Sequence, residues 1–410
     1  MLFNKFINQS IRRTYKYESL AGVSFAVYNT FVIMFTPIIM RRLGADDFWM
    51  GVLMAAPVAG ALFIFFWLNL GFKMEKFKFI TITKGISRLI LIIPILLNNY
   101  ILFIAFYFLS HIMEKGTSPT YTGIMKDIYP VQHRGRAMGM VRMEVTIMSI
   151  ILFVIAGKLF DILDYRILFT IGIIFGIVAQ IIFYSIKRTV DSKPVEKRKF
   201  ILADILKILR EDKFISKYFA IFFLLGFSNI LGTTLIPLYF IDVLKMSNLS
   251  AGSFFSVNSA AMILGYYFWG HHIDKKNPLK TRLFVMILLS FMHLCFFVSS
   301  WVKTDTVILF GLIGLAYFFQ GISTSGGELA RINLFTRIVP ENMIEKYWAI
   351  DFFLLGIRGA IAPFFAIYLK NIIDFKYIFL LSFGLIQISA VLMFLLYKNN
   401  FLLLQHRGLE

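Results

Sequence analysis

Residues 71–76 read Gly-Phe-Lys-Met-Glu-Lys, and residues 270–275 read Gly-His-His-Ile-Asp-Lys, 199 positions later. Two further landmarks recur in the same order, 210 and 200 positions later: Ile-Tyr-Pro at 128–130 returns as Ile-Val-Pro at 338–340, and Asn29 with Pro37 returns as Asn229 with Pro237. Shared order and nearly constant spacing predict that one half of the chain structurally duplicates the other.

The composition indicates a membrane protein. Hydrophobic residues make up 59% of the 410 residues, 47 residues are Phe, and the mean hydropathy is +0.76. A soluble domain could not bury this much apolar surface, so we expect a lipid bilayer as the partner of the chain. The net charge of +19 would suggest nucleic acid in a soluble protein, but here the charges lie between apolar runs and we expect no nucleic acid. Duplicated halves in such a chain are typical of a transporter with its site between them.

Twelve apolar stretches predict an all-α protein with twelve transmembrane helices. They lie at 19–40, 48–70, 79–98, 100–125, 137–158, 166–186, 217–241, 250–270, 281–300, 306–330, 347–369 and 377–397. A polar stretch separates the sixth from the seventh, so we expect a six-helix bundle at 1–186, a cytoplasmic linker at 187–216 and a second six-helix bundle at 217–410. Apolar residues at helical spacing over 201–209 predict an amphipathic helix on the membrane surface within the linker.

The basic residues predict the orientation of the chain. The connections on one side, with both termini and the linker, carry 28 Lys and Arg residues, and the connections on the other side carry eight. The positive-inside rule therefore places both termini and the linker in the cytoplasm. We expect an integral protein of a prokaryotic plasma (inner) membrane that works as a monomer.

The paired turns resemble the signature of the major facilitator superfamily, which is a Gly, three residues, then Asp and a basic residue between helices 2 and 3. The matching residues are Gly71, Glu75 and Lys76 in the first copy, Gly270, Asp274 and Lys275 in the second, and Arg136 in a loop that resembles the family's connection between helices 4 and 5. The first copy has Glu in place of Asp. The resemblance covers essentially the whole chain and implies two pseudo-symmetric six-helix halves that move by alternating access. It also implies that the motif carboxylates latch a cytoplasmic gate, although tight turns with positive-inside residues would explain both copies as well.

Polar side chains inside the predicted spans bear on the substrate, because burying them is costly unless they line a cavity. The charged ones are Glu114, Lys115, Arg142, Glu328 and Arg358, and the uncharged ones are Asn29, Asn229 and Thr233. The resemblance implies that helices 1, 4, 7 and 10 surround a central cavity, so we expect these residues to contact substrate or a proton. For the uncharged residues, interhelical hydrogen bonds are an equal alternative.

Two expectations concern single carboxylates. We expect Glu114 to face the cavity without an ionic neighbour and to bind a cationic group of the substrate or a coupling proton. We expect Arg88 and Glu144, which lie at similar depth, to neutralise each other as a structural pair.

These features predict a secondary active transporter for a small solute, with protons or another coupling ion as the candidate driving force. Charges of both signs favour a polar solute: a sugar, an organic anion or a zwitterion. Drug–proton antiporters of the superfamily commonly carry G-x-x-x-G-P-x-x-G-G in helix 5, whereas residues 143–158 contain Gly157 as their one glycine and no proline. Efflux of lipophilic compounds and translocation of lipids or lysolipids on the same fold are the alternatives. The chain has no Walker A loop, its Cys295 is a single cysteine, and His111 and His293 have no partners at metal-ligand spacing, so we expect no metal, no cofactor and no enzymatic activity.

Overall fold

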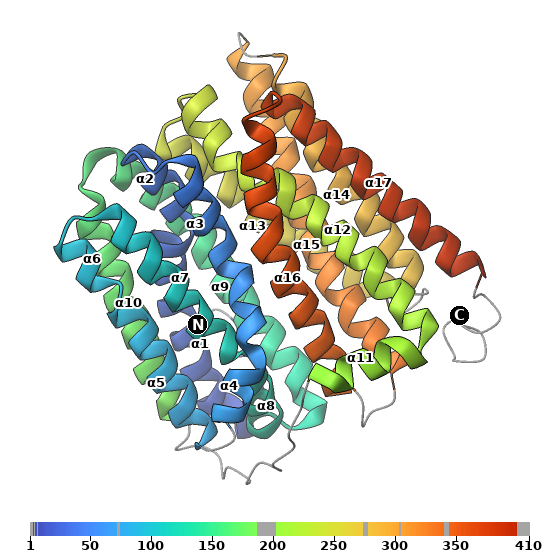
Figure 1. Ribbon diagram of the computed structural model, residues 1–410. Helices are drawn as coiled ribbons and strands as arrows, with labels where there is room; N and C mark the ends of the chain where they lie inside the picture. Colours follow the sequence, from blue (N-terminus) through green and yellow to red (C-terminus); the bar gives the residue numbers. More distant parts are fainter. Residues whose placement is uncertain are drawn as a thin grey trace. The chain divides into compact units, whose positions relative to one another are not determined.

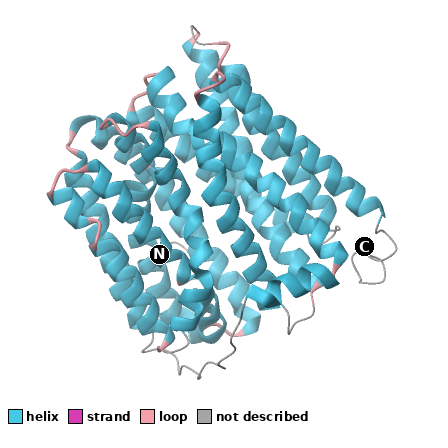
Figure 2. Cartoon of the chain, in the orientation of Figure 1, coloured by secondary structure: helices cyan, strands magenta, loops and turns pink. Residues whose placement is uncertain are grey.

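The computed structural model describes residues 3, 5, 7–71, 74–186, 202–273, 278–302, 305–339 and 344–399, and every regular element among them is a helix (Figures 1 and 2). They group into two compact units. The first comprises Met1–Lys199 with Lys245–Ser256, and the second comprises Phe200–Leu244 with Val257–Glu410. The predicted boundaries at 186 and 217 stay a prediction.

Several of the membrane segments in the first unit are interrupted into shorter helices. The helices of this unit are η2 (Gln9–Ile11), α1 (Arg12–Tyr28), η3 (Asn29–Met34), α2 (Thr36–Arg42), α3 (Asp47–Ala59), η4 (Gly60–Phe63), α4 (Ile64–Gly71), α5 (Lys76–Leu89), α6 (Ile92–Leu96), α7 (Tyr100–Gly116), α8 (Ser118–Ile128), α9 (Val131–Ile162) and α10 (Tyr165–Ser185).

The second unit contains longer, less interrupted helices. They are α11 (Leu202–Glu211), α12 (Lys213–Leu238), η6 (Tyr239–Val243), α13 (Asn248–Ile273), α14 (Pro278–Ser299), α15 (Thr306–Ile338), α16 (Ile344–Lys370) and α17 (Phe375–Asn399). Helix α13 begins in the first unit, which extends to Ser256, and continues in the second.

These helices form twelve successive segments at the predicted positions, so the prediction of an all-helical membrane protein is confirmed. Among the described residues, nine helices are long and apolar enough to cross a membrane, and the segment Asp47–Phe63 is apolar but shorter. Large apolar side chains such as Leu96 and Val307 are exposed, as lipid-facing positions require. Helix α11 occupies the place of the predicted amphipathic helix, while its position on a membrane surface stays a prediction.

Polar residues just before the apolar runs explain where several helices begin. The side chains of Asp46, Asn99 and Asp212 accept hydrogen bonds of 2.9, 2.9 and 3.0 Å from the backbone N–H three residues ahead. The Asp305 carboxylate accepts from two such N–H groups. Each contact satisfies donors that have no partner inside the helix, so it fixes the end of the segment.

Each of the duplicated prolines lies close to a π-helical distortion of the first helix of its half, while Asn229 lies within regular helix α12. Asn29 begins the π-helical segment η3, and Pro37 follows it at the start of α2. In the second half, Pro237 lies in the last turn of α12 directly before the π-helical segment η6. Such widened turns recur at functional sites, which makes both helices candidates for a binding role.

Helix packing within the two units follows one scheme. In the first unit α10 packs on α1 and on α5, and α9 packs on α1. In the second unit α17 packs on α12 and on α14, and α16 packs on α12. Glycines allow one further close contact in each unit, between η4 and α7 in the first and between α13 and α15 in the second. A Cβ on Gly60 would lie 2.7 Å from the backbone oxygen of His111, and a Cβ on Gly321 would lie 2.3 Å from the backbone oxygen of Asn258. The halves therefore repeat each other in packing as well as in sequence.

Candidate functional site

A buried charged cluster occupies the first unit between α5, α7 and α10. The side chain of Arg88 is fully buried, and its Nε lies 3.4 Å from Oε1 of Glu114. Its Nη1 donates to the backbone oxygen of Gly176, and its guanidinium carbon lies 4.7 Å from the ring centre of Tyr28. Three helices and an aromatic face thus hold one guanidinium in place.

The expectation that Glu114 has no ionic neighbour is wrong, because helix packing brings α5 against α7 and sets Arg88 beside it. The expected pairing of Arg88 with Glu144 is wrong for the same reason. The groups that act electrostatically on Glu114 are Arg88, His111, Lys84 and Lys115. Glu114 and Lys115, both predicted site residues, therefore belong to one cluster with more basic than acidic groups.

Glu144 belongs instead to a second buried cluster, which sequence reasoning missed. Its oxygens accept hydrogen bonds from the Ser19 hydroxyl and from the backbone N–H of Phe3. The neighbouring Glu18, of which only 4% is exposed, accepts from the hydroxyls of Tyr121 and Tyr129. The predicted first span began after Glu18, whereas α1 begins at Arg12 and includes it.

Arg142 is placed close to this second cluster. It lies on α9 and acts electrostatically on Glu18 and Tyr121, although its own surface is exposed. A carboxylate held mainly by hydroxyl donors can change its charge with less disturbance than one held by a guanidinium. The cluster therefore differs in chemistry from the one around Glu114.

The uncharged predicted site residues have local partners. Asn29 is half-buried and begins η3. Asn229 Oδ1 lies 3.2 Å from Nε2 of His293 on α14, and the Thr233 hydroxyl donates 2.9 Å to the backbone oxygen of Asn229. The hydrogen bond between α12 and α14 fits the interhelical alternative for Asn229, and substrate contact stays a prediction.

In the second unit, charged residues gather between α12, α14, α15 and α16. Nη1 of Arg331 lies 2.9 Å from Oδ2 of Asp351, and Nη1 of Arg358 donates 2.8 Å to the backbone oxygen of Phe222. Glu328, in contrast, accepts a 2.5 Å hydrogen bond from the Tyr266 hydroxyl. The two predicted residues Glu328 and Arg358 thus have different partners.

In the first copy of the turn motif, the structure describes Gly71 and residues 74–76. Gly71 ends α4, Glu75 directly precedes α5, and Lys76 Nζ lies 2.6 Å from Oδ2 of Asp127 on α8. Arg136 is exposed on α9. In the second copy, Gly270 lies within α13, while Asp274 and Lys275 lie outside the described residues.

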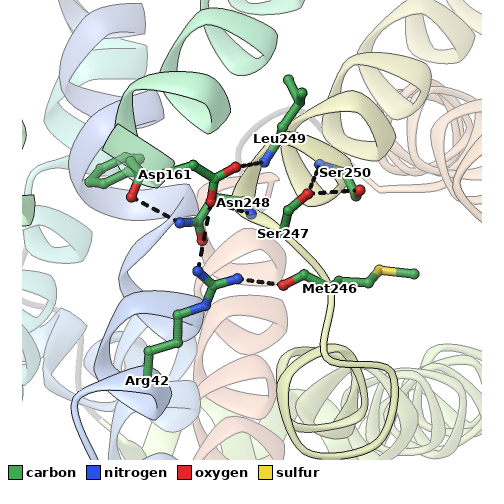
Figure 3. Close-up of polar contacts among 8 residues, drawn as sticks. Arg42, Asp161, Met246, Ser247, Asn248, Leu249 and Ser250 are labelled. Atoms are coloured by element: carbon green, nitrogen blue, oxygen red, sulfur yellow. Dashed lines mark hydrogen bonds and ion pairs between the residues drawn. The ribbon is translucent and has the colours of Figure 1, made fainter. Parts of the chain in front are cut away.

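A further polar cluster, also missed from the sequence, joins the ends of α2 and α9 to the start of α13 (Figure 3). Asp161 accepts hydrogen bonds of 3.0 Å from the backbone N–H groups of Asn248 and Leu249. Nη1 of Arg42 lies 3.8 Å from Asp161, and Nη2 donates to the backbone oxygen of Met246. The partners lie too far apart in sequence for any local pattern to predict the contact.

No set of three His, Cys, Asp or Glu side chains that could hold a metal ion occurs within the described ranges. The side chains in the clusters are suited to binding charged or hydrogen-bonding groups and to moving protons. Each cluster draws residues from several helices, so a movement of one helix would change its charge balance.

The comparisons with known proteins agree with this architecture. A family model described as Major Facilitator Superfamily matches residues 19–317. A search of curated proteins found no match. Among solved structures, the chain is similar to the nucleoside transporter NupG, with 13% identity, a TM-score of 0.68, and coverage of 94% of this chain and 99% of that one.

Two other solved structures are equally similar. A D-xylose-proton symporter has 12% identity and a TM-score of 0.67, with 92% of this chain and 96% of that chain covered. A bacterial homologue of the human lysosomal transporter Spinster, in an inward-facing and occupied conformation, has 14% identity and a TM-score of 0.67, with 95% and 98% covered. At these identities the likeness shows a shared fold.

Proposed function

The chain belongs to the major facilitator superfamily and is a secondary transporter, and from that premise we propose that its cargo is a small polar solute. The family consists of transporters and not of enzymes. The observation that carries the proposal is that each unit holds charged side chains deep among its helices, with Arg88 fully buried in the first and Arg358 4% exposed in the second. Charges at such depth are costly in a bilayer and are typical of pathways for polar groups.

Two of the similar structures have polar cargo by name, a nucleoside and D-xylose. Their identity to this chain is too low to transfer a substrate, but they show that this fold accommodates polar solutes. A sugar, an organic anion and a zwitterion are the classes that fit the charges of both signs. We propose that Asn29, Glu114, Lys115, Arg142, Asn229, Thr233, Glu328 and Arg358 include the residues that meet the cargo.

We propose alternating access as the mechanism and the turn motifs as part of its gate. The 2.6 Å contact of Lys76 with Asp127 ties the start of α5 to α8, which leaves Glu75 at the turn itself. A carboxylate at such a turn can cap the positive end of another helix and release it when the helices move. We assign Gly71, Arg136, Gly270, Asp274 and Lys275 to the same gate, with the Asp274 carboxylate as the counterpart of Glu75.

We propose a proton as the coupling ion. Glu18 and Glu144 support this, because each is 4% exposed and is bound by hydroxyl groups. Glu114 is a weaker candidate, since adding a proton to it would leave the buried Arg88 without its carboxylate.

A binding screen with the purified full-length protein tests the proposed cargo. Sugars, nucleosides, amino acids and organic acids are compared with cationic drugs and lysolipids by the shift in thermal unfolding midpoint. We expect one polar class to raise the midpoint, because a ligand that binds only the folded state stabilises it. That class should then accumulate in proteoliposomes when a pH gradient is imposed. Shifts confined to cationic drugs or lysolipids would contradict the proposal and support efflux of lipophilic compounds or lipid translocation.

The membrane orientation has a separate test. A reporter that is active only in the cytoplasm should be active when it is fused after Glu410. The reason is that the 28 basic residues of one set of connections outnumber the eight of the other. The matched control is the same reporter inserted after Lys245, between predicted helices 7 and 8, which should be inactive. Activity after Lys245 and none after Glu410 would reverse the topology.

A further inference from the structure

Three arginines from three helices of the second unit lie in one region, two of them against the ring of Phe222 and the third against the ring of Trp348. The guanidinium carbon of Arg282 on α14 lies 4.4 Å from the ring centre of Phe222 on α12, and that of Arg358 on α16 lies 4.7 Å from it. Arg331 on α15 reaches the same region through its ion pair with Asp351. We call Arg282, Arg331 and Arg358 the arginine cluster.

The charges of the arginine cluster are not balanced by the described residues. Asp351 is the one carboxylate that acts on Arg282 and on Arg358, and it is already paired with Arg331. Three guanidinium groups therefore share a single carboxylate. Arg282 and Arg358 are 5% and 4% exposed, so solvent does little to offset the repulsion. Buried charge of one sign is costly unless a counter-charge is bound.

Hydrogen-bond donors of the cluster are also in excess. Nη1 of Arg282 donates 2.7 Å to the backbone oxygen of Gly327, and Nη1 of Arg358 donates to Phe222. These two bonds fix the orientation of the guanidinium planes. The Nε atoms of all three arginines and the buried hydroxyl of Tyr218 have no hydrogen-bond partner within the described part of the chain, and neither does one acceptor of the cluster, Oδ1 of Asp351. Four donors in one charged region match the needs of an oxyanion.

We propose that the arginine cluster binds an oxyanion, namely the carboxylate or phosphate group of the transported solute. The planar guanidinium donates two parallel hydrogen bonds to such a group, and three of them can bind all of its oxygens. This inference rests on the proposed function and narrows the cargo to an organic anion. A positive excess in the same place disfavours cationic drugs and gives a neutral sugar no advantage.

Phosphate binding to the purified full-length protein tests the cluster directly. Sodium phosphate replaces sodium chloride at constant ionic strength, and the thermal unfolding midpoint is recorded. We expect a saturable rise for the parent protein. Arg358→Gln and Arg282→Gln should each raise the half-saturating phosphate concentration about ten-fold or more, because each removes a charged hydrogen-bond donor. Lys376→Gln removes the same charge at the start of α17 and should behave like the parent.

Two further arms decide the remaining points. Arg358→Lys keeps the positive charge but lacks the planar pair of donors of a guanidinium, so it should weaken phosphate binding. This variant tests the site if Arg358→Gln does not fold. Succinate and glycerol 3-phosphate should compete with inorganic phosphate. Phosphate binding with no competition by either would overturn the assignment to the cargo. An equal midpoint rise in parent and arginine variants would overturn the site. Uptake of a neutral sugar by a protein that binds no phosphate would overturn this inference while leaving polar-solute transport intact.

Discussion

Glu114→Gln is expected to lower the free energy of unfolding by about 3–5 kcal/mol, the usual effect of removing one partner of a buried ion pair. The structure makes this carboxylate the less replaceable partner. Arg88, Lys84, Lys115 and His111 all act on it. The amide of Gln keeps the shape but leaves these basic groups without a negative charge.

The double variant distinguishes the ion pair from general packing. Adding Arg88→Gln removes the cation that Glu114 balances, so the two substitutions should be non-additive by about 0.5–3 kcal/mol. Unfolding of the purified protein in detergent, followed by tryptophan fluorescence, measures both effects. The matched control is Glu211→Gln, which removes a carboxylate 3.9 Å from Lys207 on the exposed surface of α11 and should change stability by less than about 0.5 kcal/mol.

Transport by the same variants distinguishes binding from coupling. If Glu114 stays ionised beside Arg88, Glu114→Gln should alter transport without changing its pH dependence. Loss of pH-driven accumulation with intact exchange of substrate across the membrane would show that Glu114 carries the coupling proton instead. Wild-type stability together with additive substitutions would show that the 3.4 Å contact contributes nothing to folding.

The arrangement of the helices was predictable from the sequence because apolar length and basic connections follow from the bilayer itself. The partners of Arg88 were not predictable. Its neighbours Glu114, Gly176 and Tyr28 lie on three helices, and which of them meet depends on how those helices pack. Depth from the membrane surface indicated Glu144, which lies on another face of the bundle.

Helix ends were the other source of error. Hydropathy indicates the part of a helix that lies in lipid, whereas the backbone hydrogen bonds of the helix continue beyond the apolar stretch. Helix α1 therefore begins at Arg12, and Glu18 lies inside a helix whose predicted start was residue 19. The arginine cluster shows the limit set by helix packing. Arg358 was predicted as a charged residue inside a span, but Arg282 and Arg331 lie on other helices, and only the packing of those helices brings the three together.

Asp161→Asn is expected to speed amide hydrogen exchange in residues 245–256 by about 5- to 30-fold, which corresponds to a loss of about 1–2 kcal/mol. The Asp161 carboxylate binds the N–H groups of Asn248 and Leu249 at the positive end of α13 (Figure 3). A charged cap at a helix N-terminus contributes about this much, and a neutral amide keeps part of the hydrogen bonding but loses the charge.

Arg42 should add to the same effect. It joins the end of α2 to this contact through Asp161 and the backbone oxygen of Met246, so Arg42→Gln should also raise exchange in residues 245–256, by less. Since α13 continues into the second unit, loosening its first turns should also change the rate at which the transporter alternates between states.

Asp164→Asn is the matched control for the contacts of Asp161 and Arg42 with the start of α13. Asp164 lies three residues further on and caps α10, and hydrogen bonds from Arg166 lower the pKa of its carboxyl from the ordinary value. It has no contact with α13 among the described residues, so its substitution should leave exchange in residues 245–256 unchanged. Equal exchange in the parent and Asp161→Asn would mean that the cap does not hold α13. A rise in both aspartate variants would mean that a general change in surface charge, and not the capping carboxylate, controls the start of this helix.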